Sequence, residues 1–239
     1  MNELKLFLEK HRVRDASRRN FVCLHKDTGS FRQGNFHIPA NEQTNFWKLF
    51  ATAAPFFTER NGPSLVYRPP LRTAQPFNLD LDLRFATKTP VPEKLHTAFA
   101  QKLALKLVEV CQQTVTFYVV AKESGYFKTY ADQTKVWAGG CHIYFANVRI
   151  PLRVARDMKK YAETIVLDFY RHLQPTNSPD DMIDNRIVER KNGVCLIATY
   201  KGPNAGGRYL LRRAGSVDEK GEVRETRFDA PTLFKQLEK

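Results

Sequence analysis

One stretch of the chain, residues 77–85, alternates strictly between apolar and polar side chains. Phenylalanine or leucine occupies each odd position, and the even positions carry Asn78, Asp80, Asp82 and Arg84. A period of two is typical of a half-buried β-strand, with one face in a core and a polar row on the other. We therefore predict a strand that holds Asp80 and Asp82 on one face, with their Cα atoms roughly 6.5–7 Å apart.

Helices and strands are predicted in mixed order along the rest of the chain. Apolar residues at helical spacing predict helices over 2–10, 43–50, 92–113, 152–173 and 231–239. Runs of β-branched and aromatic residues predict strands over 21–24, 65–67, 115–121, 141–145, 194–198 and 209–211. The polar stretch 122–140 is predicted to be a long functional connection. Helices placed between several strands indicate an α/β or α+β fold around a mixed sheet.

Composition narrows the class of partner and compartment. The chain of 239 residues carries 38 Lys and Arg against 25 Asp and Glu, a net charge of +13, which favours a polyanion such as nucleic acid. Its four cysteines are widely separated and form no C-x-x-C pair, so we expect reduced thiols rather than a disulfide framework or zinc ribbon. No secretory signal or membrane-length apolar run occurs, so a soluble intracellular protein without a membrane partner is expected.

The acidic pair on the predicted strand is the first candidate site. Carboxylates placed side by side repel each other unless a cation lies between them, and they can bind one divalent ion or a pair of ions. The alternative is an ordinary solvated strand face. Because Asp is disfavoured in strands and this chain is basic overall, we favour the interpretation that Asp80 and Asp82 bind metal.

Further candidates lie downstream. His142 follows two glycines and opens an apolar strand, where it can meet a phosphate or simply be structural. Asp184 follows a loop rich in Pro, Ser and Asp, and it is a turn or cap residue unless it completes the metal site. Lys201 and Arg208 flank a glycine-containing loop that could grip phosphates. Because this loop lacks the ending of a Walker motif, an ATP-driven motor is not indicated.

Taken in order, these stretches resemble the archaeo-eukaryotic primase superfamily, especially the primase domains of poxvirus- and asfarvirus-type primase-helicases. Residues 79–83 resemble the acidic-strand motif of that family, 140–145 its histidine motif and 184–201 its third region. The resemblance extends over roughly residues 64–209.

The resemblance implies a single archaeo-eukaryotic primase (prim-pol) catalytic domain over 1–239, with a mixed sheet. A helix-rich N-terminal part would span about 1–75 and an RRM-like catalytic half 76–239, with no helicase domain in this chain. It also implies two Mg²⁺ or Mn²⁺ ions, NTP or dNTP substrates, a single-stranded DNA template and a replicative helicase as partner. If the protein is viral, a host-cell replication compartment is expected. The residues implied are Asp80, Asp82 and Asp184 for catalysis and metal, and His142, Lys201, Arg208 and Lys135 for the nucleotide.

The chain also departs from this family. Val188, Cys195 and Ala198 stand where Tyr, Arg and Gly are usual, which affects how nucleotide or template is held near the third motif. Our leading hypothesis is a DNA primase or primase-polymerase that joins nucleotides on a single-stranded template. The alternatives are a non-catalytic module that binds single-stranded nucleic acid and a metal-dependent nuclease, which also uses clustered carboxylates.

Overall fold

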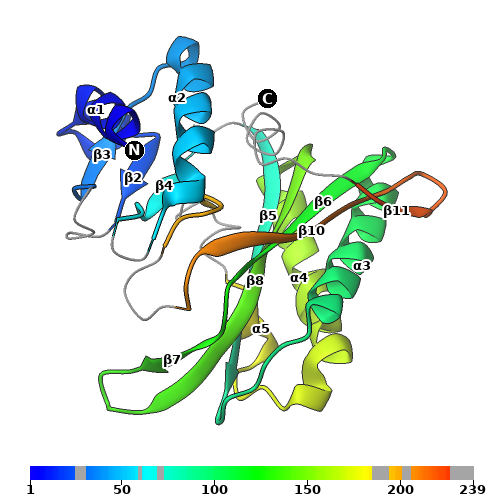
Figure 1. Ribbon diagram of the computed structural model, residues 1–239. Helices are drawn as coiled ribbons and strands as arrows, with labels where there is room; N and C mark the ends of the chain where they lie inside the picture. The colour runs from blue at the N-terminus through cyan, green and yellow to red at the C-terminus, as the bar shows by residue number, and fades with distance from the viewer. Residues whose placement is uncertain (25–30, 59–60, 69–72, 185–193, 201–205, 227–239) are drawn as a thin grey trace. The chain divides into compact units, whose positions relative to one another are not determined.

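Two units, each with its own sheet, make up the part of the chain that the structure describes (Figure 1). The computed structural model describes all residues except 25–30, 59–60, 69–72, 185–193, 201–205 and 227–239. The first unit takes the described residues within Met1–Pro70 and Asn192–Tyr209, and the second takes those within Leu71–Lys191 and Leu210–Phe228.

The first unit pairs a five-stranded sheet with two helices. The strand order is β1-β3-β2-β4-β9, and all its pairs are antiparallel. The strands are β1 (Arg12–Val13), β2 (Phe21–Cys23), β3 (Gly34–Phe36), β4 (Leu65–Tyr67) and β9 (Val194–Cys195). The two α-helices are α1 (Asn2–Lys10) and α2 (Ala40–Ala53), and η1 (Ala16–Arg18) and η2 (Ala54–Phe56) are short 3-10 helices. The predicted helices at 2–10 and 43–50 are therefore confirmed, the second with wider bounds.

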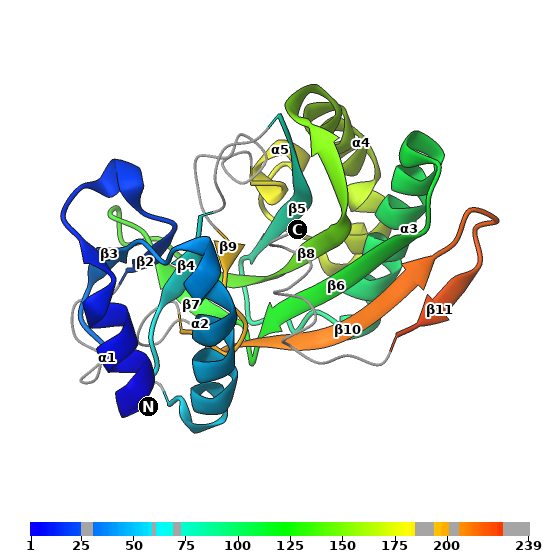
Figure 2. The same ribbon diagram turned by 90° about the horizontal axis from the view of Figure 1, so that it is seen from above.

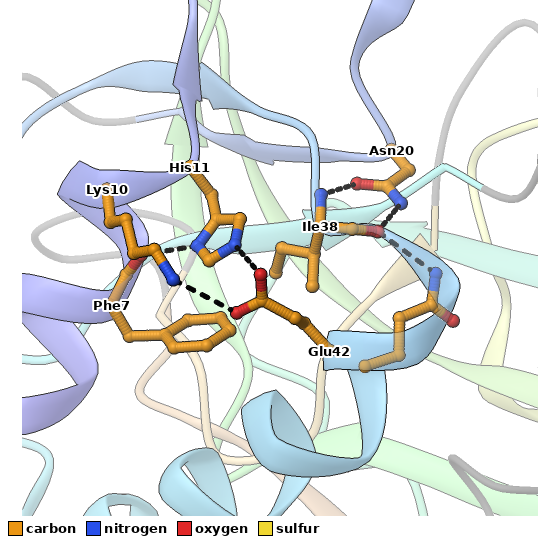
Figure 3. Close-up of polar contacts among 7 residues, drawn as sticks. Phe7, Lys10, His11, Asn20, Ile38 and Glu42 are labelled. Carbon is orange, nitrogen blue, oxygen red and sulfur yellow. Dashed lines mark hydrogen bonds and ion pairs between the residues drawn. The ribbon is translucent and has the colours of Figure 1, made fainter.

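Aromatic packing and polar contacts between its elements hold the first unit together. The ring of Phe21 lies 4.6 Å from Phe46 and 4.9 Å from Tyr67, so strands and helix α2 share an aromatic core. Figure 3 shows His11 between the two helices: its Nδ1 lies 2.8 Å from the Phe7 carbonyl oxygen, and its Nε2 lies 3.2 Å from the Glu42 carboxylate. This hydrogen bond from His11 is the main cause of the lowered pKa of Glu42.

The second unit contains a six-stranded sheet covered on one face by two long helices. The strand order is β11-β10-β6-β8-β5, and β7 pairs with β8 beyond that row. The strands are β5 (Ala74–Phe85), β6 (Val115–Lys122), β7 (Tyr126–Thr129), β8 (Lys135–Pro151), β10 (Tyr209–Val217) and β11 (Val223–Glu225). The helices are α3 (Glu93–Cys111), α4 (Leu152–Tyr170), η3 (Arg171–Leu173) and α5 (Pro179–Met182). Figure 2 shows α3 and α4 side by side along the sheet.

The hydrophobic core of the second unit lies between this sheet and helices α3 and α4. Strand β5 contributes its odd positions from Phe77 to Phe85, and α3 contributes residues such as Phe99 and Leu103. The strict period of two in β5 therefore has the cause inferred from the sequence, which is burial of one face. The strand prediction for 77–85 is confirmed.

Several predicted elements differ from the structure, among them the strand predicted over 141–145, which extends over Lys135–Pro151 as β8. Residues 122–140 are not a long connection, because β6 continues to Lys122 and the segment then forms the β7–β8 hairpin. The strand predicted over 194–198 ends at Cys195, because Ala198 adopts φ 66° in the left-handed region, which interrupts an extended chain. Strand β10 is longer than predicted, and β11 was not predicted. The helix predicted over 231–239 lies outside the described residues.

The prediction of an α+β fold is confirmed, with two sheets in place of one mixed sheet. In the second unit, the pairs β10–β11, β5–β8, β6–β8 and β7–β8 are all antiparallel. None of the described helices combines the length and the apolar character that a membrane crossing requires.

Candidate functional site: a carboxylate–histidine row on one face of the sheet

Strand β5 presents its polar residues on the face of the sheet that is opposite to helices α3 and α4. Since the odd positions belong to the core, Asn78, Asp80, Asp82 and Arg84 project from the other face. The side chains of Asp80 and Asp82 are 21% and 34% exposed, so solvent reaches both carboxylates. The sequence-based placement of the two aspartates on one face is thus observed.

His142 stands beside Asp80 on the neighbouring strand. The two residues are direct partners in the antiparallel β5–β8 ladder, so their side chains share one face. The Nε2 atom of His142 lies 3.4 Å from Oδ1 of Asp80, and its Nδ1 lies 2.9 Å from the hydroxyl oxygen of Tyr144. Both ring nitrogens therefore have partners, and the buried imidazole is held in one orientation.

Asp184 reaches the same row from the other side of β5. Ile183 forms an isolated antiparallel bridge with Leu81, and both side chains enter the core. The next residue, Asp184, is therefore directed to the opposite face and lies across from Asp80, to whose carbonyl oxygen its backbone N–H donates at 3.0 Å. Residues directly opposite in such a pair have Cβ atoms about 4.5–5.5 Å apart. His142, Asp80 and Asp184 thus form one row across three neighbouring segments.

Asn177 and Thr176 hold the segment that delivers Asp184 against the edge of β5. The Asn177 side-chain oxygen accepts a hydrogen bond from the Arg84 N–H at 3.0 Å, and its nitrogen donates to the Asp82 carbonyl oxygen at 2.7 Å. Thr176 donates both its backbone N–H and its hydroxyl to the Arg84 carbonyl oxygen. Sequence reasoning treated 177–181 only as a loop and missed this role, for which an Asn near Ser-Pro was the available signal.

Asp82 has two structural neighbours on this face. Its Oδ2 lies 3.1 Å from Nη2 of Arg84, two residues along the same strand. Burial acts to lower the pKa of the Arg84 guanidinium, but the charge of Asp82 and the hydrogen bond to it outweigh burial, so the pKa is raised. On the other side, Asp82 pairs with Gly140 of β8, which leaves this carboxylate beside a position without a side chain.

Gly140 is required by the pairing of β5 and β8. Its φ is +130°, and a Cβ at this position would lie 1.9 Å from the carbonyl oxygen of Leu81. The close approach that the sequence suggested for a phosphate is therefore made, in the structure, by the backbone of the acidic strand itself.

The other three predicted residues differ in where the structure places them. Lys135 lies at the start of β8, an odd number of residues from His142, and so projects from the opposite face of the hairpin, where it is exposed. Arg208 belongs to the first unit, where it forms an isolated antiparallel bridge with Tyr200. Lys201 lies outside the described residues.

The donor set of the row suits Mg²⁺ or Mn²⁺, since carboxylate oxygens are the ligands that these hard cations prefer. The carboxylates are nevertheless engaged with protein groups, Asp80 with His142 and Asp82 with Arg84. Over the described ranges, no group of three or more His, Cys, Asp or Glu side chains is gathered so as to hold a metal ion. The carboxylates therefore suit these ions chemically but are not arranged to hold one in the described part of the chain. Metal binding requires Asp80 to release His142 and Asp82 to release Arg84.

The fold defines an α+β protein whose second unit carries a row of carboxylate and histidine side chains. Comparison with protein families makes the assignment specific. A family profile described as "C962R protein N-terminal AEP domain" matches residues 27–213, and AEP stands for archaeo-eukaryotic primase. The match spans most of the chain, so the chain belongs to this family, whose namesake is an asfarvirus primase-helicase. The resemblance inferred from the sequence is confirmed. No curated protein matches the chain.

Proposed function

We propose that this chain is a DNA primase, or primase-polymerase, that joins nucleotides on a single-stranded DNA template. The observation that carries the proposal is the row His142–Asp80–Asp184, in which residues from three distant parts of the sequence meet on one face of the sheet. In this proposal, two carboxylates from one strand and a third from the segment bridged to it would come together as an oxygen-rich site next to an imidazole. This arrangement suits the handling of a triphosphate.

Each residue has a distinct role in this proposal. Asp80, Asp82 and Asp184 would hold two Mg²⁺ or Mn²⁺ ions, which when bound neutralise phosphate charge and stabilise the attacking and leaving oxygens. His142, oriented by Tyr144, would donate a hydrogen bond to the phosphates of the incoming NTP or dNTP. Lys201 and Arg208 would add positive charge. We leave Lys135 out of this role because of its place on the other hairpin face.

No covalent intermediate is needed. Cys141, next to His142, is buried in the core. Its burial and, to a smaller extent, the charge of Asp80 raise the pKa of its thiol well above the usual value. A buried thiol with a raised pKa is a poor nucleophile. Positioning and charge neutralisation therefore carry the proposed reaction, as they do in most phosphoryl-type transfers.

The experiment is primer synthesis on single-stranded DNA, with ribo- or deoxyribonucleotides and Mg²⁺ or Mn²⁺. We expect Asp80→Asn, Asp82→Asn and Asp184→Asn each to abolish synthesis while binding of the template persists. Asp157→Asn, on the exposed surface of α4, is the matched control and should retain activity. Full synthesis by any one of the three site variants would overturn the proposal.

A second candidate is a non-catalytic module that binds single-stranded nucleic acid. It is favoured by the present pairing of Asp80 with His142 and of Asp82 with Arg84. Template binding without any synthesis, under both metals and both kinds of nucleotide, would select it. Degradation of labelled DNA without added nucleotides would instead select a metal-dependent nuclease.

The family also points to a cellular process and a partner. We propose a role in DNA replication alongside a replicative helicase, either fused to the same polypeptide or separate. Stimulation of primer synthesis by such a helicase would test this part.

A further inference from the structure

The sheet face that carries the acidic row continues along the β7–β8 hairpin as a strip of tyrosines and cations. Figure 1 shows the hairpin running on beyond the part of the sheet that α3 and α4 cover. Along β8, the residues on this face after His142 are Gly140, Ala138 and Val136, since side chains alternate. The middle of the strip therefore carries no long side chain.

Longer side chains stand on both sides of this floor. Ala138 pairs with Arg84 on β5 and with Tyr126 on β7, so these two residues face each other across it. Lys128 pairs with Val136, two residues further along β8. Strand β6 ends at Lys122, which lies on the same face as Val120, the partner of His142.

Each cation of the strip rests on a tyrosine ring. The Lys122 ammonium lies 3.9 Å from the centroid of the Tyr126 ring. Lys128 and Arg84 both lie over Tyr130, at 5.1 Å and 6.0 Å from the ring centroid. A cation on the face of an aromatic ring is attracted by the ring quadrupole, which limits the positions that a long side chain occupies. Three positive charges are thus held above a floor of small residues that leads to Asp82.

We propose that this strip, defined as Arg84, Lys122, Tyr126, Lys128 and Tyr130, binds the phosphate backbone of a single nucleic-acid strand and guides it to the acidic row. Lys122 and Lys128 contact successive phosphates, and Arg84 joins them when Asp82 exchanges its present partner. The tyrosines are positioning residues that hold the cations. The inference rests on the proposed function, because it names the path of the template toward the same site.

A nucleic-acid strand fits the strip better than an acidic protein segment does. The strip alternates cations with aromatic rings, which is the arrangement that single-strand-binding surfaces use for a phosphate backbone with unpaired bases. It is also continuous with the carboxylates at which a strand end would react. The acidic residues of the hairpin itself, Glu123 and Asp132, are exposed and are not part of the strip.

The test measures binding of the full chain to a fluorescent single-stranded 20-mer by anisotropy, without nucleotide or divalent metal. The double variant Lys122→Ala, Lys128→Ala should bind roughly tenfold more weakly at 0.1 M salt. Its slope of log K against log [salt] should be smaller by about 1.4, since each single-strand phosphate contact contributes about 0.7. The matched control is the double variant Lys88→Ala, Lys102→Ala, which also removes two positive charges. Lys88 lies over the ring of Trp137, and Lys102 is exposed on helix α3. This control should bind like the wild-type protein apart from a small general effect.

The tyrosines give a second readout. Tyr126→Leu should weaken binding of the oligonucleotide several-fold. Tyr126→Phe keeps an aromatic ring under Lys122 and should bind the oligonucleotide with wild-type affinity. Equal losses in the two lysine pairs, or unchanged binding in Lys122→Ala, Lys128→Ala, would overturn the inference. Displacement of the oligonucleotide by polyglutamate of equal charge would also overturn it, in favour of an acidic protein partner.

Failure of the strip and failure of the proposed function can be told apart. The binding assay needs no catalysis, so a chain without primase activity can still show a strip that binds nucleic acid. If the strip variants bind normally while Asp80→Asn still abolishes synthesis, the inference fails and the proposed function stands.

Discussion

The backbone N–H of Asp184 donates a hydrogen bond to the carbonyl oxygen of Asp80 across 3.0 Å. This bond fixes the register in which a segment after helix α5 approaches the outer edge of strand β5. Because Ile183 turns into the core at this bridge, the Asp184 side chain is left on the same face as Asp80 and His142. The composition of the candidate site therefore depends on one short antiparallel contact.

The first prediction concerns Asn177, which ties the segment before Asp184 to β5. Asn177→Ala should cost about 1–3 kcal/mol in the free energy of unfolding, because it leaves the Arg84 N–H and the Asp82 carbonyl without their partner. It should also speed hydrogen exchange of the Asp184 amide and lower primer synthesis roughly tenfold through misplacement of the third carboxylate.

Asn147 supplies a matched control for this experiment. Its side chain makes the same two kinds of bond, accepting from the Thr116 N–H and donating to the Thr114 carbonyl oxygen, at a place away from the acidic row. Asn147→Ala should lower stability but leave the Asp184 amide and synthesis unchanged. Equal effects of both variants on synthesis would count against a special role for Asn177.

The second prediction concerns Gly140. Gly140→Ala should destabilise the fold by about 2–4 kcal/mol, since the new Cβ meets the Leu81 carbonyl oxygen at 1.9 Å and the residue has φ +130°. Gly139→Ala is the control, because its Cβ would meet the Val91 side chain at 3.3 Å, and that side chain can shift. Urea unfolding checks both variants, and a stable Gly140→Ala protein would contradict the prediction.

The third prediction is a pH dependence of stability that arises at His96. This buried residue lies 2.9 Å from the Tyr170 hydroxyl, and burial lowers its pKa from 6.5 to about 4. Below pH 6.5 the unfolded chain binds a proton that folded His96 does not, so stability falls as the pH is lowered and the loss is complete below pH 4. At 1.36 kcal/mol per pKa unit, this costs on the order of 2–3 kcal/mol at pH 4.5 relative to pH 7.

His96→Gln isolates this effect from other titrating groups. Its side chain is neutral over the whole range, so the decrease in unfolding free energy between pH 7 and pH 4.5 should be smaller by the same amount. Urea unfolding at the two pH values measures it. A variant as sensitive to acid as the wild-type protein would show that His96 is not the cause.

The fourth prediction concerns the partner of His142. Tyr144→Phe removes the hydroxyl that lies 2.9 Å from Nδ1 of His142, so the imidazole loses its orienting bond. We expect the KM for the incoming nucleotide to rise about tenfold, which corresponds to about 1.4 kcal/mol, with a smaller change in kcat and a shifted pH profile. Tyr161→Phe, on helix α4, should change neither. An unchanged KM and pH profile in Tyr144→Phe would exclude this role.

The fifth prediction is that replacing alanine by glycine at position 198 stabilises the fold, although this replacement usually destabilises a protein. Ala198 has φ 66°, a left-handed conformation that costs an L-residue about 1–2 kcal/mol. Ala198→Gly should therefore raise the unfolding free energy by up to about 1 kcal/mol, after the greater freedom of glycine in the unfolded chain is subtracted. Ala155→Gly in helix α4 is the control and should lower it.

Much of this fold follows from local pattern. The alternation over 77–85 predicted strand β5 and the shared face of Asp80 and Asp82, because a period of two has one structural meaning when one face is buried. The long helices α3 and α4 were also predicted from the burial of one face, because an apolar stripe at helical spacing packs against a core.

The remaining features depend on partners distant in sequence. Residues 126–129 and 135–140 were taken for a connection because their polar and aromatic side chains occur on both faces, and only pairing between β7 and β8 makes them strands. The proximity of Asp184 to Asp80 arises from the single bridge between Leu81 and Ile183, for which no periodicity exists. The sequence analysis grouped Asp184 with Asp80 because of the resemblance to a family, and not because of any hydrophobic pattern.

The bonds that Asn177, Thr176 and Asp184 make to strand β5 have a consequence for self-association. They occupy backbone groups of β5 from Asp80 to Arg84 on its outer side, so a strand from a second molecule has no free row of donors and acceptors with which to extend the sheet there. The acidic strand β5 can thus lie at the edge of its sheet without exposing, at Asp80 to Arg84, an edge that promotes edge-to-edge aggregation.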